Sequence, residues 1–477
     1  MFTLNDVLQG NNDTIHLPST LSARLDQVFP AAQHDSRMVG RGDLFIAIKG
    51  EHVDGHSFIP AVAHAGAGAV ICTQPASDVP SDFLQLSVPD VVEALHATAR
   101  VRAQRQQNTT LIGITGSNGK TSTKEAVATV LERQAPTLKT FASYNNEIGY
   151  PLTLLRLEPQ HRYAVLEMGA QWVGELTWLC DTIATPHWSL ITNVGAAHLS
   201  YFGSQERVIQ AKSELVQVLP SDGIAILNYD DSNVREMSKK TQARVLFYGL
   251  SEGTEVRGSD IGGDALRGRH FTLSYHDQQV RVQLRLPGEH GLTIALAAAA
   301  AGCAAEIPLS DIQAALESLS PARGRGEIKP GPNGSTLIDD TYNANRQSII
   351  AITQAMRAAA IAPGGKRWAV LGDIFELGQY ARFEHCESGR ALVGAIDYLV
   401  AVGDEARYYV EGAIRSKMPA EQIYYFDADV ENGPELEAAK RAAADLLKKE
   451  VKSADMVLIK GSRGMRMETM SGMLEHA

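Results

Sequence analysis

A chain of 477 residues is too long for one hydrophobic core, and its length predicts two to four domains. Hydrophobic residues make up 44% and charged residues 21%, which is an ordinary globular mixture. The formal charge of −11 argues against a broad nucleic-acid-binding surface, so we expect no nucleic-acid partner. The four cysteines have no CxxC spacing, which favours reduced thiols over a metal site or a disulfide framework: Cys72, Cys180, Cys303 and Cys386.

Targeting and membrane signals are absent from the sequence pattern. Met1 to Gly10 lack the basic and apolar regions of a signal peptide. The longest uncharged stretch, Gly291 to Ala305, is shorter than the roughly 20 apolar residues of a membrane span. We therefore expect a cytoplasmic protein without a membrane span, and a monomer.

The first block, residues 1–105, predicts a small α/β domain. Its strands are expected at 43–48 and 69–72, and a helical stretch at 58–65. A further helix is expected to begin at Asp90, with Glu93 placed for a capping box. The polar run 104–110 predicts a linker.

The second block, residues 106–320, alternates apolar runs and helical segments, which predicts a mostly parallel sheet. Its expected strands lie at 111–115, 163–166, 189–194 and 223–228, and its expected helices at 120–132 and 292–305. The pattern of residues 245–287 is rich in strand-forming residues and predicts an antiparallel extension of this sheet.

The third block, residues 321–477, predicts a second, doubly wound Rossmann-like unit. Its expected strands lie at 336–339, 368–371, 398–402 and 456–459, with a helix at 435–449. The fold class is therefore α/β with three domains, 1–105, 106–320 and 321–477.

A glycine-rich segment between a strand and a helix is the clearest functional signal. In Gly113 to Thr121, glycines let backbone N–H groups turn inward around a phosphate, and the following helix N-terminus adds positive potential. Lys120 is expected to meet the outer phosphates and Thr121 to bind Mg²⁺ through its hydroxyl. Ile114 stands where the first glycine of a standard Walker A loop would be. The alternative is a helix-entry turn, which the strand and helix context disfavours.

The run Thr115 to Thr121 resembles the ATP loop of the Mur ligases and of their relatives, the folylpolyglutamate synthetases. These enzymes use ATP to make an acyl phosphate that an amine then attacks. The resemblance implies that ATP is bound by Gly116, Ser117, Asn118, Gly119, Lys120, Thr121 and Ser122.

Three further segments of the central block match the family at residues that would hold Mg²⁺ or catalyse the transfer. Glu167 in Glu-Met-Gly resembles the metal-binding glutamate, and His198 ends an Asn-x-Gly-x-x-His match. Lys212 stands where the family lysine is typically carbamylated and helps to hold a second Mg²⁺. Together with Lys120 these three residues form the expected catalytic set, and with Thr121 the expected metal set. Their generic readings are a strand-end acid, a structural histidine and a solvated surface lysine.

The resemblance also implies a binding site for a UDP-linked substrate. Ser36 and Arg37, ahead of Gly40-Arg41-Gly42-Asp43, would lie near the uridine or diphosphate, and arginine suits a diphosphate. Asn146, in Tyr144 to Gly149, would face the substrate; the alternative is an Asx-turn.

The third block supplies the remaining expected contacts. Arg325 in Gly-Arg-x-Glu and Asp340 after a strand would bind ATP, and Asn343 and Asn345 the substrate. Lys460 or Arg463 would hold the carboxylate of a dipeptide.

Three positions depart from the family pattern. Gly291 and Ile294 replace asparagines, one of which would contact adenine, and Arg346 replaces a proline that would stiffen its loop.

Gly372 to Gly378, His385 and Lys460 to Arg466 resemble the branch of the family that adds D-alanyl-D-alanine, and no Asp-Asn-Pro-Arg motif of the preceding branch is present. The resemblance, which covers nearly the whole chain, implies that ATP and Mg²⁺ are used to join D-alanyl-D-alanine to UDP-N-acetylmuramoyl-tripeptide. The alternatives are another Mur-type, folate or cyanophycin ligase that uses a different amine, a P-loop ATPase switch, and a degenerate ligase retained for binding. The sequence leaves the third residue of the peptide open between diaminopimelate and lysine.

Overall fold

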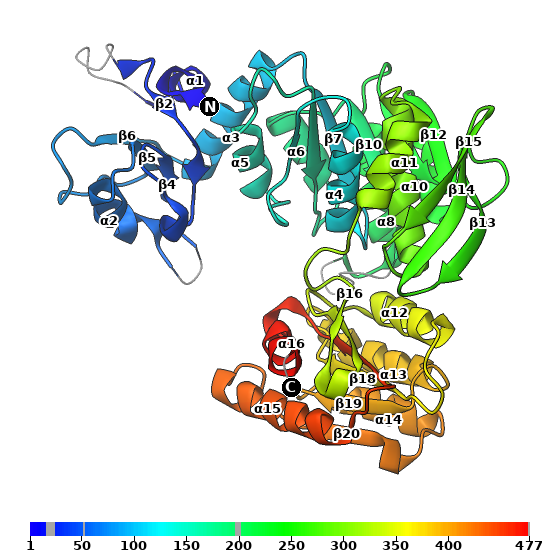
Figure 1. Ribbon diagram of the computed structural model, residues 1–477. Helices are drawn as coiled ribbons and strands as arrows, with labels where there is room; N and C mark the ends of the chain where they lie inside the picture. Colours follow the sequence, from blue (N-terminus) through cyan, green and yellow to red (C-terminus); the bar gives the residue numbers. More distant parts are fainter. Residues whose placement is uncertain (16–23, 51–52, 196–201, 476–477) are drawn as a thin grey trace.

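The computed structural model describes residues 1–15, 24–50, 53–195 and 202–475. Within these ranges the strands form three larger sheets and one two-stranded ribbon. Figure 1 shows three bodies in chain order, with the C-terminal body beneath the central one and the N-terminal body beside it. Each domain expected from the sequence contains one of the larger sheets, which confirms the α/β fold class. The exact domain limits stay a prediction.

The N-terminal body has a four-stranded parallel sheet in the order β3-β4-β5-β6. Its elements are β1 (Phe2–Thr3), α1 (Leu4–Gly10), β2 (Val28–Phe29), β3 (Ala32–Gln33), β4 (Leu44–Ile46), α2 (Ile59–His64), β5 (Ala69–Cys72), β6 (Leu84–Ser87) and α3 (Val91–Arg105). Asp90 caps α3, because its carboxylate accepts from the amides of Val92 and Glu93, which is one half of the predicted capping box; the returning bond to the Glu93 side chain is not found among the described residues.

The predicted linker at 104–110 is shorter than expected, because α3 continues through Arg105 and the next strand begins at Thr110. Arg102 on the last turns donates to the carbonyl of Leu157 in the central body, at 2.9 Å from Nε, and Arg105 pairs with Asp6 in α1. The end of the helix is therefore held from both sides.

The central body is built on a nine-stranded sheet in the order β15-β14-β13-β12-β11-β10-β7-β9-β8. The strands are β7 (Thr110–Thr115), β8 (Thr137–Lys139), β9 (Tyr163–Glu167), β10 (Trp188–Ile191), β11 (Ile224–Asn228), β12 (Arg244–Gly249), β13 (Val256–Asp264), β14 (Gly268–Tyr275) and β15 (Gln278–Leu284). The seven strands from β13 to β8 along the sheet, β7 among them, pair in parallel. β13, β14 and β15 pair antiparallel, so the predicted extension is confirmed. The predicted strand 189–194 ends earlier, at Ile191.

Helices cover the central sheet, and the helix that follows the glycine loop packs against an alanine-rich one. The described helices of the central body are α4 (Lys120–Leu131), α5 (Gly149–Leu154), α6 (Glu175–Thr182), α8 (Gln205–Gln217), α9 (Ser232–Glu236), α10 (Gly288–Ala304) and α11 (Leu309–Ser318). A Cβ at Gly302 would lie 2.6 Å from Val130, so the small residues of α10 permit close contact with α4. This contact fixes the helix whose N-terminus faces the site.

The C-terminal body is a six-stranded sheet in the order β16-β17-β21-β18-β19-β20, with only β16 antiparallel. Its elements are β16 (Glu327–Pro330), β17 (Thr336–Asp340), α12 (Arg346–Ala358), β18 (Arg367–Gly372), α13 (Ala381–Leu392), β19 (Tyr398–Val402), α14 (Arg407–Arg415), β20 (Ile423–Phe426), α15 (Gly433–Glu450), β21 (Met456–Lys460) and α16 (Glu468–Leu474). One apolar core includes residues of α12, α13 and α14, and a second includes residues of α15 and α16. The doubly wound prediction is confirmed.

No helix in the described ranges has the length and apolar character to cross a membrane. The cysteines are unpaired thiols, and Cys72, Cys180 and Cys303 are buried.

Candidate active site

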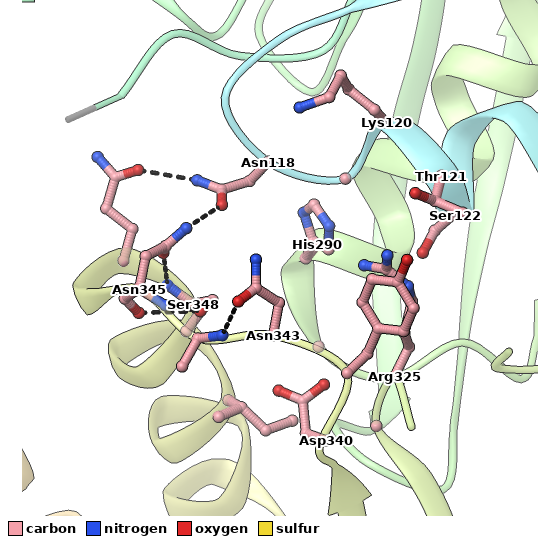
Figure 2. Close-up of a pocket in the computed structure, with 18 of the residues that line it drawn as sticks. Asn118, Lys120, Thr121, Ser122, His290, Arg325, Asp340, Asn343, Asn345 and Ser348 are labelled. Atoms are coloured by element: carbon pink, nitrogen blue, oxygen red, sulfur yellow. Dashed lines mark hydrogen bonds between the residues drawn. The ribbon is translucent and has the colours of Figure 1, made fainter. Parts of the chain in front are cut away.

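A cleft of about 800 Å³ lies between the central and C-terminal bodies. It is lined by the glycine loop, the start of α10, the joint between the two bodies, the loop after β17 and the loop after β21. In Figure 2 the loop with Asn118 and Lys120 stands opposite Asp340, Asn343 and Asn345. Both bodies therefore contribute side chains to one cavity.

The glycine loop adopts a conformation that requires glycine at two positions. Gly116 and Gly119 have φ of 146° and 80°, and a Cβ at Gly119 would lie 2.6 Å from Cε1 of His290. The Nζ of Lys120 donates to the carbonyl of Gly116 at 2.8 Å. Burial lowers the pKa of Lys120, and also that of His290. The loop therefore presents backbone amides and a helix N-terminus to the cleft.

Glu167 ends β9, which is paired with β7, and so stands beside the glycine loop. Its Oε1 accepts from the hydroxyl of Thr121 at 3.2 Å and from the amide of Asn145 at 2.9 Å. Its buried Oε2 has no hydrogen-bond partner among the described residues. Hard divalent cations prefer oxygen ligands, so this carboxylate oxygen beside a threonine hydroxyl fits Mg²⁺.

Lys212 on α8 is buried, so it is not the solvated surface lysine of the generic reading. Burial, followed by the positive charge of Lys120, lowers its pKa to about 7. Its Nζ lies 3.5 Å from the carbonyl of Ala170. A buried amine that is about half neutral near pH 7 has the chemistry that carbamylation requires. His198 lies outside the described residues.

The C-terminal side of the cleft is organised around a buried ion pair. The Nζ of Lys460 lies 2.6 Å from Oδ2 of Asp340 and donates to the carbonyl of Asn343 at 2.8 Å. The Lys460 side chain is 3% exposed, whereas that of Arg463 is 63% exposed. Of the two cations expected to hold a carboxylate, Arg463 is thus the accessible one.

Tyr342 packs against the joint between the two bodies and bonds to the central body. The guanidinium of Arg325 lies 4.0 Å from the centre of the Tyr342 ring. The Tyr342 hydroxyl shares a 2.5 Å hydrogen bond with the hydroxyl of Ser143.

The tip of the glycine loop also touches the C-terminal body directly. The side chain of Asn118 accepts from Nδ2 of Asn345 at 2.5 Å and donates to Oε1 of Gln347 at 3.0 Å (Figure 2). Asn345 caps α12 by accepting from the amide of Ser348. Gln347 and Ser143 were missed in the sequence analysis, because no local pattern marks a contact between distant bodies.

The residues expected at the UDP-linked substrate do not line this cleft. Ser36 and Arg37 lie in a short 3-10 turn, and the exposed Arg37 donates to Asp35 at 2.9 and 2.7 Å. These hydrogen bonds lower the pKa of Asp35 to about 2. Asn146 accepts from the amides of residues 148 and 149, which is the turn considered as its alternative role. The substrate contacts of these three residues stay predictions.

Two of the three departures from the family pattern have local causes, and nothing in the structure explains Ile294. A Cβ at Gly291 would lie 2.8 Å from Cβ and O of Leu286, so a side chain has no room there. Nε of Arg346 lies 3.1 Å from Oε2 of Glu384, which ties the start of α12 to α13 in place of the stiffening proline. His385 is also structural, because its Nε2 accepts from the amide of Ile374 and burial lowers its pKa to about 4.

A glycine loop with an adjacent acid, facing a doubly wound body across a cleft, defines a multidomain protein of the phosphate-loop class. Three family models match the chain in order: "Mur ligase family, catalytic domain" over 32–109, "Mur ligase middle domain" over 114–302, and "Mur ligase, glutamate ligase domain" over 324–463. The chain belongs to the Mur ligase family.

Curated relatives and solved structures agree with this assignment. The UDP-N-acetylmuramoyl-tripeptide–D-alanyl-D-alanine ligases of Mycobacterium tuberculosis and Escherichia coli are both 35% identical to the chain, covering 91% and 84% of it and 90% and 84% of their own lengths. A MurF structure from Acinetobacter baumannii has a TM-score of 0.85 at 31% identity and covers 100% of this chain and 99% of its own. The MurF ligase of Thermotoga maritima in complex with ADP has a TM-score of 0.78 at 28% identity, covering 94% and 98%.

Proposed function

We propose that this protein is an ATP-dependent ligase that joins D-alanyl-D-alanine to UDP-N-acetylmuramoyl-tripeptide and so forms the pentapeptide precursor of peptidoglycan. The observation that carries the proposal is the cleft shared by the glycine loop and the loop after β17. The Asn118–Asn345 bond spans this cleft. A phosphoryl group held by the first loop would therefore lie beside an amine held by the second. The names and coverage of the relatives support this substrate pair.

The first step is attack of the tripeptide carboxylate on the γ-phosphate of ATP, which gives an acyl phosphate and ADP. Gly116 to Ser122 surround the phosphates through backbone amides, and Lys120 stabilises the charge that spreads over the transferred group. Arg325 and Asp340 are assigned to the nucleotide from the other side of the cleft.

Thr121, Glu167, His198 and carbamylated Lys212 would hold Mg²⁺, which neutralises phosphate charge when bound. The unpartnered Oε2 of Glu167 and the lowered pKa of Lys212 support this assignment.

In the second step the amine of D-alanyl-D-alanine attacks the acyl carbon, and phosphate leaves. Arg463 is the better anchor for the dipeptide carboxylate, because its side chain is 63% exposed and its pair with Glu468 is longer, at 3.3 Å, whereas the buried Lys460 pairs with Asp340 at 2.6 Å. Asn343 and Asn345 are assigned to the same substrate, and Ser36, Arg37 and Asn146 to the UDP-linked one. Closure of the C-terminal body over the central body would exclude water from the acyl phosphate.

Phosphate release from MgATP tests the proposal. The assay contains UDP-N-acetylmuramoyl-tripeptide, in its diaminopimelate and lysine forms, with and without D-alanyl-D-alanine, and with free diaminopimelate, lysine and glutamate as competing amines. The expected result is release that needs both substrates, together with a product of pentapeptide mass. Phosphate release with a single amino acid in place of the dipeptide would assign the chain to another branch of the family. Release without a carboxylate and an amine would indicate an ATPase switch, and no turnover with all substrates would indicate a binding protein.

A further inference from the structure

Lys124 is a buried lysine to which neither the sequence analysis nor the proposed mechanism gives a role. It lies on α4, one turn beyond Lys120, and its side chain is 0% exposed. Lysine is almost never fully buried unless its ammonium group is paired, because removing a charge from water is costly. The partners of Lys124 therefore indicate what the buried charge does.

Three acceptors match the three N–H donors of the Lys124 ammonium group. Nζ donates to the carbonyls of Thr140 at 2.7 Å and Ala142 at 2.5 Å, and lies 3.1 Å from Oε1 of Glu125. It also lies 4.0 Å from Oε2 of Glu167, the carboxylate oxygen without a hydrogen-bond partner among the described residues. One charge thus contacts both the segment after β8 and the acid beside the glycine loop.

The segment held by Lys124, residues 140–146, is here named the junction loop. Its Ala142 has φ of 48°, a left-handed conformation that is unfavourable for alanine and needs support from its surroundings. The Lys124 bond to the carbonyl of that same residue supplies such support.

The next three residues of the junction loop reach all three bodies of the molecule. The Ser143 hydroxyl bonds to Tyr342 of the C-terminal body. The Tyr144 ring packs edge-on against His34 of the N-terminal body, with ring centres 5.6 Å apart. Asn145 donates to Glu167 at 2.9 Å. The junction loop therefore connects the phosphate-loop helix with both outer bodies.

We propose that Lys124 is a positioning residue, which holds the junction loop against α4 so that the nucleotide side of the cleft and the two outer bodies are aligned for transfer. It acts through Ser143, Tyr144 and Asn145 and does not touch substrate. The effect on catalysis rests on the proposed function, whereas the effect on the loop does not.

Lys139→Met is the matched control for Lys124→Met. Lys139 pairs with the other oxygen of the same Glu125, at 2.6 Å, but its side chain is 39% exposed and does not line the cleft. Each variant removes one of the two lysine ammonium groups that pair with Glu125, but only Lys124→Met releases the junction loop. Lys124→Gln, which places a neutral amide donor where the ammonium donor was, is a second variant.

Hydrogen–deuterium exchange of the ligand-free protein tests the loop without any substrate. In Lys124→Met we expect exchange in the junction loop, residues 140–146, to rise roughly ten-fold, while α10 and the C-terminal sheet are unchanged. Lys124→Gln should show a smaller rise in the same segment, and Lys139→Met none. A uniform rise over the central body, or loss of cooperative unfolding in both Lys124 variants, would overturn the proposal, because Lys124 would then be a general requirement of the core.

Kinetics test the link to transfer. For Lys124→Met we expect kcat to fall about 10–100-fold, since misplacement by about an ångström costs that much, with the KM for ATP changed less than about 3-fold. Combining it with Tyr342→Phe should give less than the product of the two single effects, because both act through the junction loop. Unchanged kcat, or fully multiplicative effects, would refute the positioning role. If the wild-type protein shows no ligase activity while the exchange result holds, the proposed function fails and the loop assignment stands.

Discussion

Asn118→Ala would test whether transfer occurs in the arrangement in which Asn118 contacts the C-terminal body, here named the closed arrangement. The variant removes the two side-chain bonds from the tip of the glycine loop to Asn345 and Gln347. It keeps the backbone bonds of residue 118, which donates to Asn193 at 3.0 Å and accepts from Thr192 at 2.7 Å. The loop itself should therefore retain its shape.

The magnitude follows from those two bonds. Both are at least partly exposed to solvent, so each contributes about 0.5–1 kcal/mol net. Their loss weakens closure by about 1–2 kcal/mol, which lowers the closed population, and with it kcat/KM, by roughly 5–30-fold if closure is unfavourable without ligands.

Steady-state phosphate release gives kcat/KM, and fluorescence energy transfer between dyes on the two bodies gives the closed fraction with a non-hydrolysable ATP analogue. Both should fall together in Asn118→Ala. Asn108→Ala, an exposed position outside the cleft, is the control and should match the wild type. A kcat/KM and a closed fraction both within two-fold of wild type would refute the reasoning, because these bonds would then not stabilise the arrangement in which transfer occurs.

Three further outcomes are expected. Arg37→Ala should raise the KM for the UDP-linked substrate several-fold and leave the KM for ATP unchanged, because Arg37 lies outside the nucleotide cleft. An equal rise in both KM values would exclude a UDP-specific role. Gly119→Ala should weaken ATP-analogue binding in calorimetry by at least about 10-fold, because its φ of 80° costs alanine about 1–2 kcal/mol and its Cβ would meet His290; unchanged affinity would contradict this close approach. Lys212, with a pKa of about 7, is mostly protonated below that pH and mostly neutral above it, so activity at a fixed CO₂ concentration should fall from pH 8 to pH 6. Activity in CO₂-depleted buffer should be low, and added bicarbonate should raise it more at pH 8 than at pH 6. Lys212→Ala should remove both activity and the bicarbonate response, and an active variant would exclude carbamylation as a requirement.

The sequence by itself determined the features that depend on neighbouring residues. The apolar run before Gly116 and the amphipathic run after it predict a strand, a loop and a helix, because side-chain periodicity is a local property. The order of apolar strands and helices likewise predicted a parallel sheet, its antiparallel extension and a doubly wound third unit. The motifs around Glu167 and Asp340 fall at strand ends for the same local reason.

Only the tertiary structure decided which of these residues meet. Asn118 and Asn345 are 227 positions apart, and no pattern in either segment predicts their bond. The sequence also left Lys460 and Arg463 equivalent, whereas the fold pairs Lys460 with Asp340 and leaves Arg463 accessible.

Lys212 and Lys124 show the same difference between what the sequence predicts and what the tertiary structure decides. A helical pattern does not record what packs against each face, so the sequence singled out Lys212 only through its resemblance to the family lysine and did not single out Lys124. Folding removes both from water, which lowers the pKa of Lys212 and surrounds Lys124 with three acceptors. Burial and pairing arise from segments that are distant along the chain, so the three-dimensional packing, and not the local sequence, sets the chemistry of these two amines.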